Sequence, residues 1–219
     1  MPEINSIPYE TAEDLNKFLY DNYYSIENLD LTTTGTGFLN NHIFELSQET
    51  GGTINSICMI NYNLPYFNPL YAEAVWKCYM DDADDCFVFF GFKETTAEPT
   101  FAMVESHTGF MINEGKLYVS VADGFTQQKV EIIGIDITRV QNYKIEYDRF
   151  YIMPLPKIEV ALGLPEILSV DRVWKLQTTL SNFPPENQVH YIVQYIKNSI
   201  NANKIIKFNR FIYKEVYAD

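Results

Sequence analysis

The sequence predicts an all-β protein, an antiparallel two-sheet β-sandwich preceded by a short helix. From about residue 53 to residue 217, short runs of alternating apolar and polar residues follow one another, separated by turn-forming residues at regular spacing. Aromatic residues make up 15% of the 219 residues and are mainly Tyr and Phe, whose side chains suit the faces of a pleated sheet. Helical periodicity is almost absent from this region, which favours strands throughout.

The N-terminal segment differs from the rest and predicts a helical arm over residues 1–25, followed by one sandwich domain over residues 26–219. Thr11 and Asp14 resemble a capping box, and apolar residues then recur at helical spacing, so we expect a short amphipathic helix over residues 12–23. The apolar stripe of this helix consists of Leu15, Phe18, Leu19 and Tyr23. A linker rich in Thr and Gly is expected at residues 32–37.

Strands are expected near residues 38–46, 53–60, 70–80, 86–93, 100–112, 116–122, 129–137, 142–148, 149–153, 171–179, 189–197 and 204–217. The runs at 87–92 and 191–196 are apolar at nearly every position, which predicts middle strands covered on both faces. Breaks in the alternation at 130–135 and 208–211 indicate β-bulges. Three prolines within residues 154–169 predict a surface excursion without a regular strand.

Charge and cysteine content exclude several classes of protein. The formal net charge of −13 repels a phosphate backbone, so nucleic acid is not an expected partner. No apolar run is long enough for a membrane span, and no signal peptide for general secretion is recognisable. Three cysteines without a CxxC pair indicate buried thiols, with the alternative that Cys78 and Cys86 face each other across a hairpin and form a disulfide.

An acidic turn at residues 81–85 is the best candidate metal site. Carboxylate oxygens are the ligands that Ca²⁺ prefers, and four carboxylates this close repel one another without a counter-ion. The turn lacks the ligand spacing and the glycine of an EF-hand, so a solvated turn is the alternative. The candidate ligands are Asp81, Asp82, Asp84 and Asp85.

A segment rich in Tyr, Phe and Asn at residues 61–71 is the candidate ligand or interface site. Stacking surfaces next to amide groups are typical of both sugar-binding sites and protein interfaces. The alternative is that the aromatic side chains anchor a loop to the core. The candidate residues are Tyr62, Tyr66, Phe67, Tyr71, Asn61, Asn63 and Asn68.

No arrangement of residues in the sequence indicates catalysis. The three histidines are widely separated, and Ser106 and His107 are neighbours on a strand, so their side chains point to opposite faces. Glu146 and Asp148 are the one acidic pair at i, i+2 in the second half of the sheet region, and the alternation places them on a solvated face. We therefore expect that the protein is not an enzyme.

Residues 86–153 resemble the concanavalin A-like lectin and glucanase jelly roll. The resemblance rests on Phe87-Val-Phe-Phe-Gly-Phe, Gly109-Phe, Gly115-Lys-Leu-Tyr, Ile135-Asp-Ile-Thr and Asn142-Tyr-Lys-Ile-Glu-Tyr. It implies a two-sheet jelly roll over most of residues 30–217. The superfamily includes lectins, glycoside hydrolases and non-catalytic modules of viral, phage and cell-surface proteins. The acidic motif of its hydrolases and the Asp and Asn metal ligands of its legume lectins are not recognisable in this sequence.

These observations predict a non-enzymatic structural or assembly protein, most simply a capsid or decoration subunit of a virion or a subunit of a surface array. It would contact copies of itself or other structural subunits, within a virion or an extracellular surface assembly, or otherwise in the cytoplasm. The first alternative is a carbohydrate-binding, lectin-like module with a glycan as its partner. The second alternative is a glycoside hydrolase with diverged acids.

Overall fold

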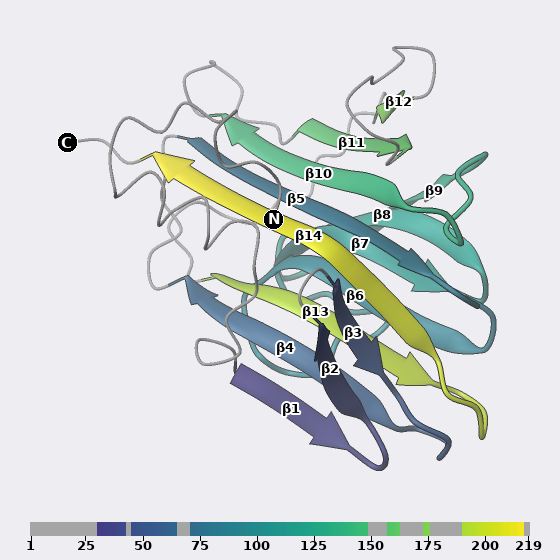
Figure 1. Ribbon diagram of the computed structural model, residues 1–219. Helices are drawn as coiled ribbons and strands as arrows, with labels where there is room; N and C mark the ends of the chain where they lie inside the picture. Colours follow the sequence, from purple (N-terminus) through teal and green to yellow (C-terminus); the bar gives the residue numbers. More distant parts are fainter. Residues whose placement is uncertain are drawn as a thin grey trace, which may run out of the picture.

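The computed structural model describes residues 30–42, 45–64, 71–148, 157–162, 173–175 and 190–216. These residues form two seven-stranded antiparallel sheets that pack face to face (Figure 1). The two-sheet sandwich expected from the sequence is therefore confirmed. The helix expected at residues 12–23, with the arm at residues 1–25, lies outside the described residues.

We call the two sheets A and B. In spatial order, sheet A consists of β1 (Asp30–Thr34), β4 (Ile57–Leu64), β13 (His190–Asn198), β6 (Cys86–Lys93), β7 (His107–Asn113), β8 (Lys116–Ala122) and β9 (Gln127–Ile132). Sheet B consists of β12 (Val173–Lys175), β11 (Lys157–Leu162), β10 (Gln141–Asp148), β5 (Tyr71–Met80), β14 (Ile205–Val216), β3 (Glu45–Glu49) and β2 (Phe38–His42).

Two late strands complete the centres of the two sheets. β13 pairs with β4 and β6, and β14 pairs with β3 and β5, so each inserts between strands from the first half of the chain (Figure 1). The middle position expected for residues 87–92 and 191–196 is confirmed, because β6 and β13 are neighbours in the centre of sheet A. The bulge expected at residues 208–211 is confirmed as a register shift between Phe208 and Arg210.

The main core lies between the sheets and is built around aromatic side chains. The ring of Phe90 from sheet A lies 5.0 Å from the ring of Tyr143 and 5.7 Å from that of Trp76, both from sheet B. Phe110 of the neighbouring strand lies 5.3 Å from Phe90. Each such pair contributes about 0.5–1.5 kcal/mol beyond the burial of its apolar area. The two sheets are therefore joined by direct ring contacts.

The structure corrects four expectations about the strands. Residues 30–34 form the edge strand β1 and not part of a linker, and residues 94–106 form a loop, so β7 begins only at His107. β9 ends at Ile132 in continuous register with β8, without the bulge expected at 130–135. Residues 157–162 form β11, because the prolines of this region precede and follow this six-residue run and its ladder donors are intact.

All three cysteines are buried and free, as the simpler expectation required. Burial raises the pKa of the Cys58 thiol to about 11 and that of Cys86 to about 12. The alternative of a Cys78–Cys86 disulfide is wrong, because Cys78 lies in β5 of sheet B and Cys86 in β6 of sheet A, which do not form a hairpin. In the described part of the chain, no helix has the length and apolar character needed to cross a membrane.

Candidate functional site

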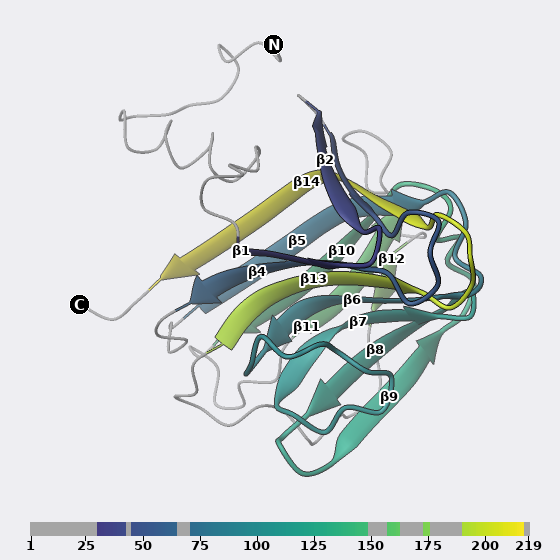
Figure 2. The same ribbon diagram turned by 90° about the horizontal axis from the view of Figure 1, so that it is seen from below.

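The outer face of sheet A carries a second apolar cluster, separate from the core between the sheets. Side chains alternate along each strand, so Phe89 of β6, Met111 of β7 and Tyr195 of β13 point away from sheet B. Residues 94–106, which we call the covering loop, cross this face (Figure 2). Phe101 and Met103 of this loop pack onto the face. The sheet is therefore buried on both sides along its central strands.

Two glycines leave room for this cluster. Gly91 and Gly109 lie opposite each other in neighbouring strands on the outer face. A Cβ atom at Gly109 would lie 2.6 Å from the ring of Phe89, closer than real Cβ contacts allow. The ring of Phe89 thus lies against bare backbone, which lets the covering loop approach the sheet closely.

An ion pair fixes both ends of the covering loop. The ammonium group of Lys93, the last residue of β6, is fully buried and pairs with the carboxylate of Glu105. It also donates to Thr95 Oγ1 at 2.6 Å, and this hydroxyl donates to Glu105 at 3.1 Å. A cation buried in this way needs its anion, because an unpaired buried charge costs several kcal/mol. The pair therefore couples the start of the loop to its end.

A histidine and a serine meet beneath the same loop. His107 Nδ1 lies 2.7 Å from the carbonyl oxygen of Glu105, and Nε2 lies 2.8 Å from Ser120 Oγ. Gln127 donates to the same Ser120 oxygen at 3.0 Å. Burial lowers the pKa of His107 to about 4, so the imidazole is neutral at pH 7. Nδ1 then donates to the carbonyl and Nε2 accepts from the hydroxyl.

The His107–Ser120 pair resembles a nucleophile and its base, yet its surroundings favour a structural role. Both side chains are fully buried, and a backbone carbonyl stands where a carboxylate would orient a catalytic imidazole. The sequence pointed to Ser106 as the neighbour of His107, whereas the serine in contact is Ser120 on the adjacent strand. Only the register of β7 with β8 reveals this contact.

The rim of the cluster presents partly exposed aromatic rings, which we call the aromatic platform: Phe87, Phe101 and Tyr118. The ring of Phe101 lies 6.4 Å from Phe87 and 5.2 Å from Tyr118. The ammonium of Lys129 lies 3.4 Å from the centroid of the Phe101 ring and donates to the Phe101 carbonyl at 2.8 Å. Asn113 is in register with Phe87, so an amide borders the platform.

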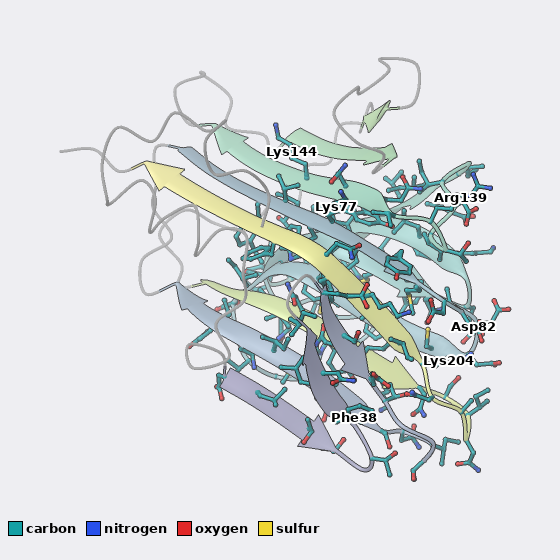
Figure 3. All side chains as sticks on the ribbon, in the orientation of Figure 1. Phe38, Lys77, Asp82, Arg139, Lys144 and Lys204 are labelled. Atoms are coloured by element: carbon teal, nitrogen blue, oxygen red, sulfur yellow. The ribbon has the colours of Figure 1, made fainter. Side chains whose placement is uncertain are left out.

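The acidic turn lies at one end of the sandwich, where lysines from β14 and the loop before it meet it. Lys204 donates to Asp82 at 2.5 Å (Figure 3). Lys207 lies 2.9 Å from Asp81. The hydrogen bond that Lys204 donates to Asp82 lowers the pKa of Asp82, and the one that Lys207 donates to Asp81 raises the pKa of Lys207. Among the described residues, no group of three or more His, Cys, Asp or Glu side chains is placed to hold a metal ion. The ammonium groups act as counter-charges to two of the four carboxylates.

The candidate residues at 61–71 are only partly described. Asn61 lies in β4 on the outer face of sheet A and is buried, and its Oδ1 has no hydrogen-bond partner among the described residues. The backbones of Tyr62 and Asn63 belong to β4 and that of Tyr71 to β5. Tyr66, Phe67 and Asn68 lie outside the described residues. Of this set, Asn61 alone is known to share a face with the aromatic platform.

Comparison with known proteins identifies the fold. No family model matches the chain, and no curated protein matches its sequence. A solved structure of a protein of unknown function from Shewanella oneidensis MR-1 superposes with a TM-score of 0.59 at 12% identity and covers 98% of each chain. It shares the fold over nearly the whole length.

Lectin domains share the fold as well. A legume lectin-like domain from Entamoeba histolytica superposes with a TM-score of 0.58 at 13% identity, covering 87% of this chain and 91% of that one. The exoplasmic/lumenal domain of VIP36, solved with Ca²⁺ and Man2 bound, gives 0.59 at 8% identity and covers 88% and 82%. At these identities the likeness shows the fold alone, a two-sheet β-sandwich that the chain shares with these lectin domains.

Proposed function

We propose that this protein is a non-catalytic carbohydrate-recognition module that binds a glycan at the aromatic platform. The observation that carries the proposal is the row of three partly exposed rings on the outer face of sheet A, bordered by the Asn113 amide. The apolar face of a sugar ring stacks on such rings, while neighbouring polar groups bond its hydroxyls. Glycan binding was the first alternative to the assembly role expected from the sequence.

The contacts beneath the platform support this proposal because they attach the covering loop at both ends. The Lys93–Glu105 ion pair and the two hydrogen bonds of His107 hold the covering loop, and with it Phe101, in one position. A preorganised site loses less conformational entropy when it binds a ligand. Lectin domains with the same fold supply a second line of support, since one of them was solved with Ca²⁺ and Man2.

A glycan array that includes mannose oligosaccharides, probed with and without Ca²⁺, tests the proposal. We expect binding by the wild type, and a loss of about tenfold or more in affinity for Tyr118→Ala, because one stacking ring is removed. Tyr79→Ala is the matched control, since Tyr79 is a partly exposed tyrosine of sheet B. Absence of binding to any glycan, or equal losses in the two variants, would contradict the proposal.

We also propose that the acidic turn binds Ca²⁺, and calorimetry tests this site. Lysines form ion pairs with Asp81 and Asp82, whereas Asp84 and Asp85 form none among the described residues. If Ca²⁺ binds here, Asp84→Asn weakens Ca²⁺ binding measured by calorimetry. Unchanged Ca²⁺ titrations for wild type and variant would contradict this site.

An assembly role is the second candidate, and one observation favours it. Large hydrophobic side chains stand exposed at both ends of β9, the outermost strand of sheet A. A structural place in a virion or a surface array would use such an edge for contacts between subunits. Self-association without any glycan ligand would favour this candidate over the first.

A further inference from the structure

One row of side chains on the outer face of sheet A remains accessible beside the covering loop. The row crosses four neighbouring strands, and its members are paired in register: Lys197 of β13, Phe87 of β6, Asn113 of β7 and Lys116 of β8. Alternation along each strand places them on the same face as the second apolar cluster. The first three are partly exposed and the fourth is exposed, so a ligand can reach all four.

The ammonium group of Lys197 has no partner of its own. Among the described residues, its side chain takes part in no ion pair and no hydrogen bond. By contrast, Lys93 on the same face pairs with Glu105, and Lys129 donates to the carbonyl of Phe101. A charge that is partly withdrawn from water without a partner is unfavourable. Lys197 is therefore placed to gain an anion from a ligand.

The amide of Asn113 is the second free polar group of this row. Its side chain forms no hydrogen bond within the part of the chain that the structure describes. It lies on the opposite side of Phe87 from Lys197. Neighbouring strands are about 4.8 Å apart, a spacing comparable to the width of a sugar ring. A sugar stacked on Phe87 would therefore meet an amide on one side and a cation on the other.

The local charge at the aromatic platform is opposite in sign to the net charge of −13 of the whole chain. The lysines that border the rings are Lys116, Lys129 and Lys197. Glu131 is the one carboxylate that the described strands place among them. Glu98 and Glu114, in the loops that border this face, are exposed, so water and salt screen their repulsion of an anion. This part of the surface can therefore accept a negative charge.

We propose that the glycan bound at the aromatic platform is acidic, and that Lys197 pairs with the carboxylate of a sugar stacked on Phe87. Uronic acids are the chemical class that fits. Each combines an apolar ring face, which stacks on an aromatic side chain, with a carboxylate for the ammonium group. Asn113 bonds hydroxyl groups of the same sugar. This inference rests on the proposed glycan binding and adds the class of the ligand.

A matched pair of ligands tests this preference: an oligosaccharide of galacturonic acid and its methyl ester, in which each carboxylate has lost its charge. Calorimetry on the full chain at low salt is expected to show about tenfold tighter binding of the acid, because the ester cannot form the charge-assisted hydrogen bond. Added salt is expected to narrow the difference, since it screens the ion pair.

Two substitutions assign the preference to Lys197. Lys197→Gln removes the charge and is expected to bind the acid and the ester with equal affinity, whereas Lys197→Arg is expected to keep the preference. Lys77→Gln serves as the control, because Lys77 is a partly exposed lysine of sheet B that also has no ion pair among the described residues. We expect it to bind both ligands as the wild type does. Thermal unfolding confirms that each variant is folded.

The possible outcomes separate this inference from the proposed function. Equal affinity of the wild type for acid and ester, or equal effects of Lys197→Gln and Lys77→Gln, would overturn the acidic preference and leave glycan binding intact. Binding of neutral mannose oligosaccharides without binding of the acid would do the same. Absence of binding to every glycan would contradict the proposed function and this inference together.

Discussion

The outer faces of the two sheets differ in how deeply they are buried, although side chains alternate between inner and outer faces along the strands of both sheets. On sheet B, buried Ala74, Trp76 and Cys78 alternate with partly exposed Val75 and Lys77 (Figure 3), and neither apolar cluster of the described residues includes the outer face of this sheet. On sheet A, the covering loop and a second cluster bury the outer face as well. An unbroken apolar run such as 87–92 therefore marks a strand covered on both sides, and the cover here is a loop that also builds the candidate site.

The largest difference in stability between substitutions on the two outer faces is expected for truncation of Phe89. Phe89→Ala leaves a cavity beneath the covering loop and is expected to lower the free energy of unfolding by about 3–5 kcal/mol. Val75→Ala on the outer face of sheet B is expected to cost less than about 1 kcal/mol. Chemical denaturation measures both, and equal small losses would mean that the second cluster does not contribute to stability.

The loss of stability at acidic pH is expected to depend on His107. Burial lowers its pKa to about 4 in the folded protein, while the unfolded chain has an ordinary value of about 6.5. Between these values the unfolded chain binds the extra proton, so stability is complete above about pH 6.5 and falls as the pH decreases toward 4. We expect this residue to contribute about 1–3 kcal/mol to that fall.

His107→Gln removes the titrating group and keeps a side chain that both donates and accepts hydrogen bonds. The loss of stability between pH 6.5 and pH 4 is expected to be smaller in this variant than in the wild type. Unfolding curves across that range provide the comparison. Parallel curves would show that folding does not lower the pKa of His107.

Two glycine substitutions compare a crowded position with an open one. Gly109→Ala brings a Cβ against the Phe89 ring and is expected to cost about 1–3 kcal/mol. Gly52→Ala has nothing within 4 Å and is expected to be neutral or slightly stabilising. Thermal unfolding separates the two, and a neutral Gly109→Ala would mean that Phe89 moves freely away from the sheet.

The smallest effect is expected from the buried lysine. Lys93→Met keeps the length of the side chain but removes the partner of Glu105, and the partly exposed carboxylate then gains water. We expect a loss of about 1–2 kcal/mol, together with earlier proteolysis within residues 94–106. The control Lys77→Met on sheet B is expected to change neither the free energy of unfolding nor the rate of proteolysis. If both variants were cleaved at the same rate, the ion pair would have no role in holding the covering loop.

The strands were predictable from the sequence where buried apolar residues alternate with exposed polar ones. They were not predictable where a loop carries the same alternation or where a strand lacks it. The covering loop carries Phe101 and Met103 at alternate positions, as a strand does, because it also rests on an apolar surface, so residues 100–112 read as one strand. β1 was missed for the opposite reason, since its five residues are all exposed and carry no apolar alternation.

Most of the candidate site could not be predicted from the sequence, because its contacts depend on the strand register and on loop closure. Ser120 reaches His107 only through the pairing of β7 with β8, and Lys93 reaches Glu105 only because the loop between them closes. Lys204 meets the acidic turn from 122 residues further along the chain. Composition indicated the acidic turn and the abundance of aromatic residues, but it contained no information about these partners.

Mapping a bound glycan onto the two outer faces tests the central claim most directly. The strongest ligand from the array would be titrated into isotopically labelled protein, and amide chemical shifts would be followed by NMR. We predict that the perturbed amides cluster around Phe87, Phe101, Asn113 and Tyr118 on sheet A. Perturbations confined to the outer face of sheet B around Tyr79, or spread evenly over the molecule, would contradict recognition at the aromatic platform.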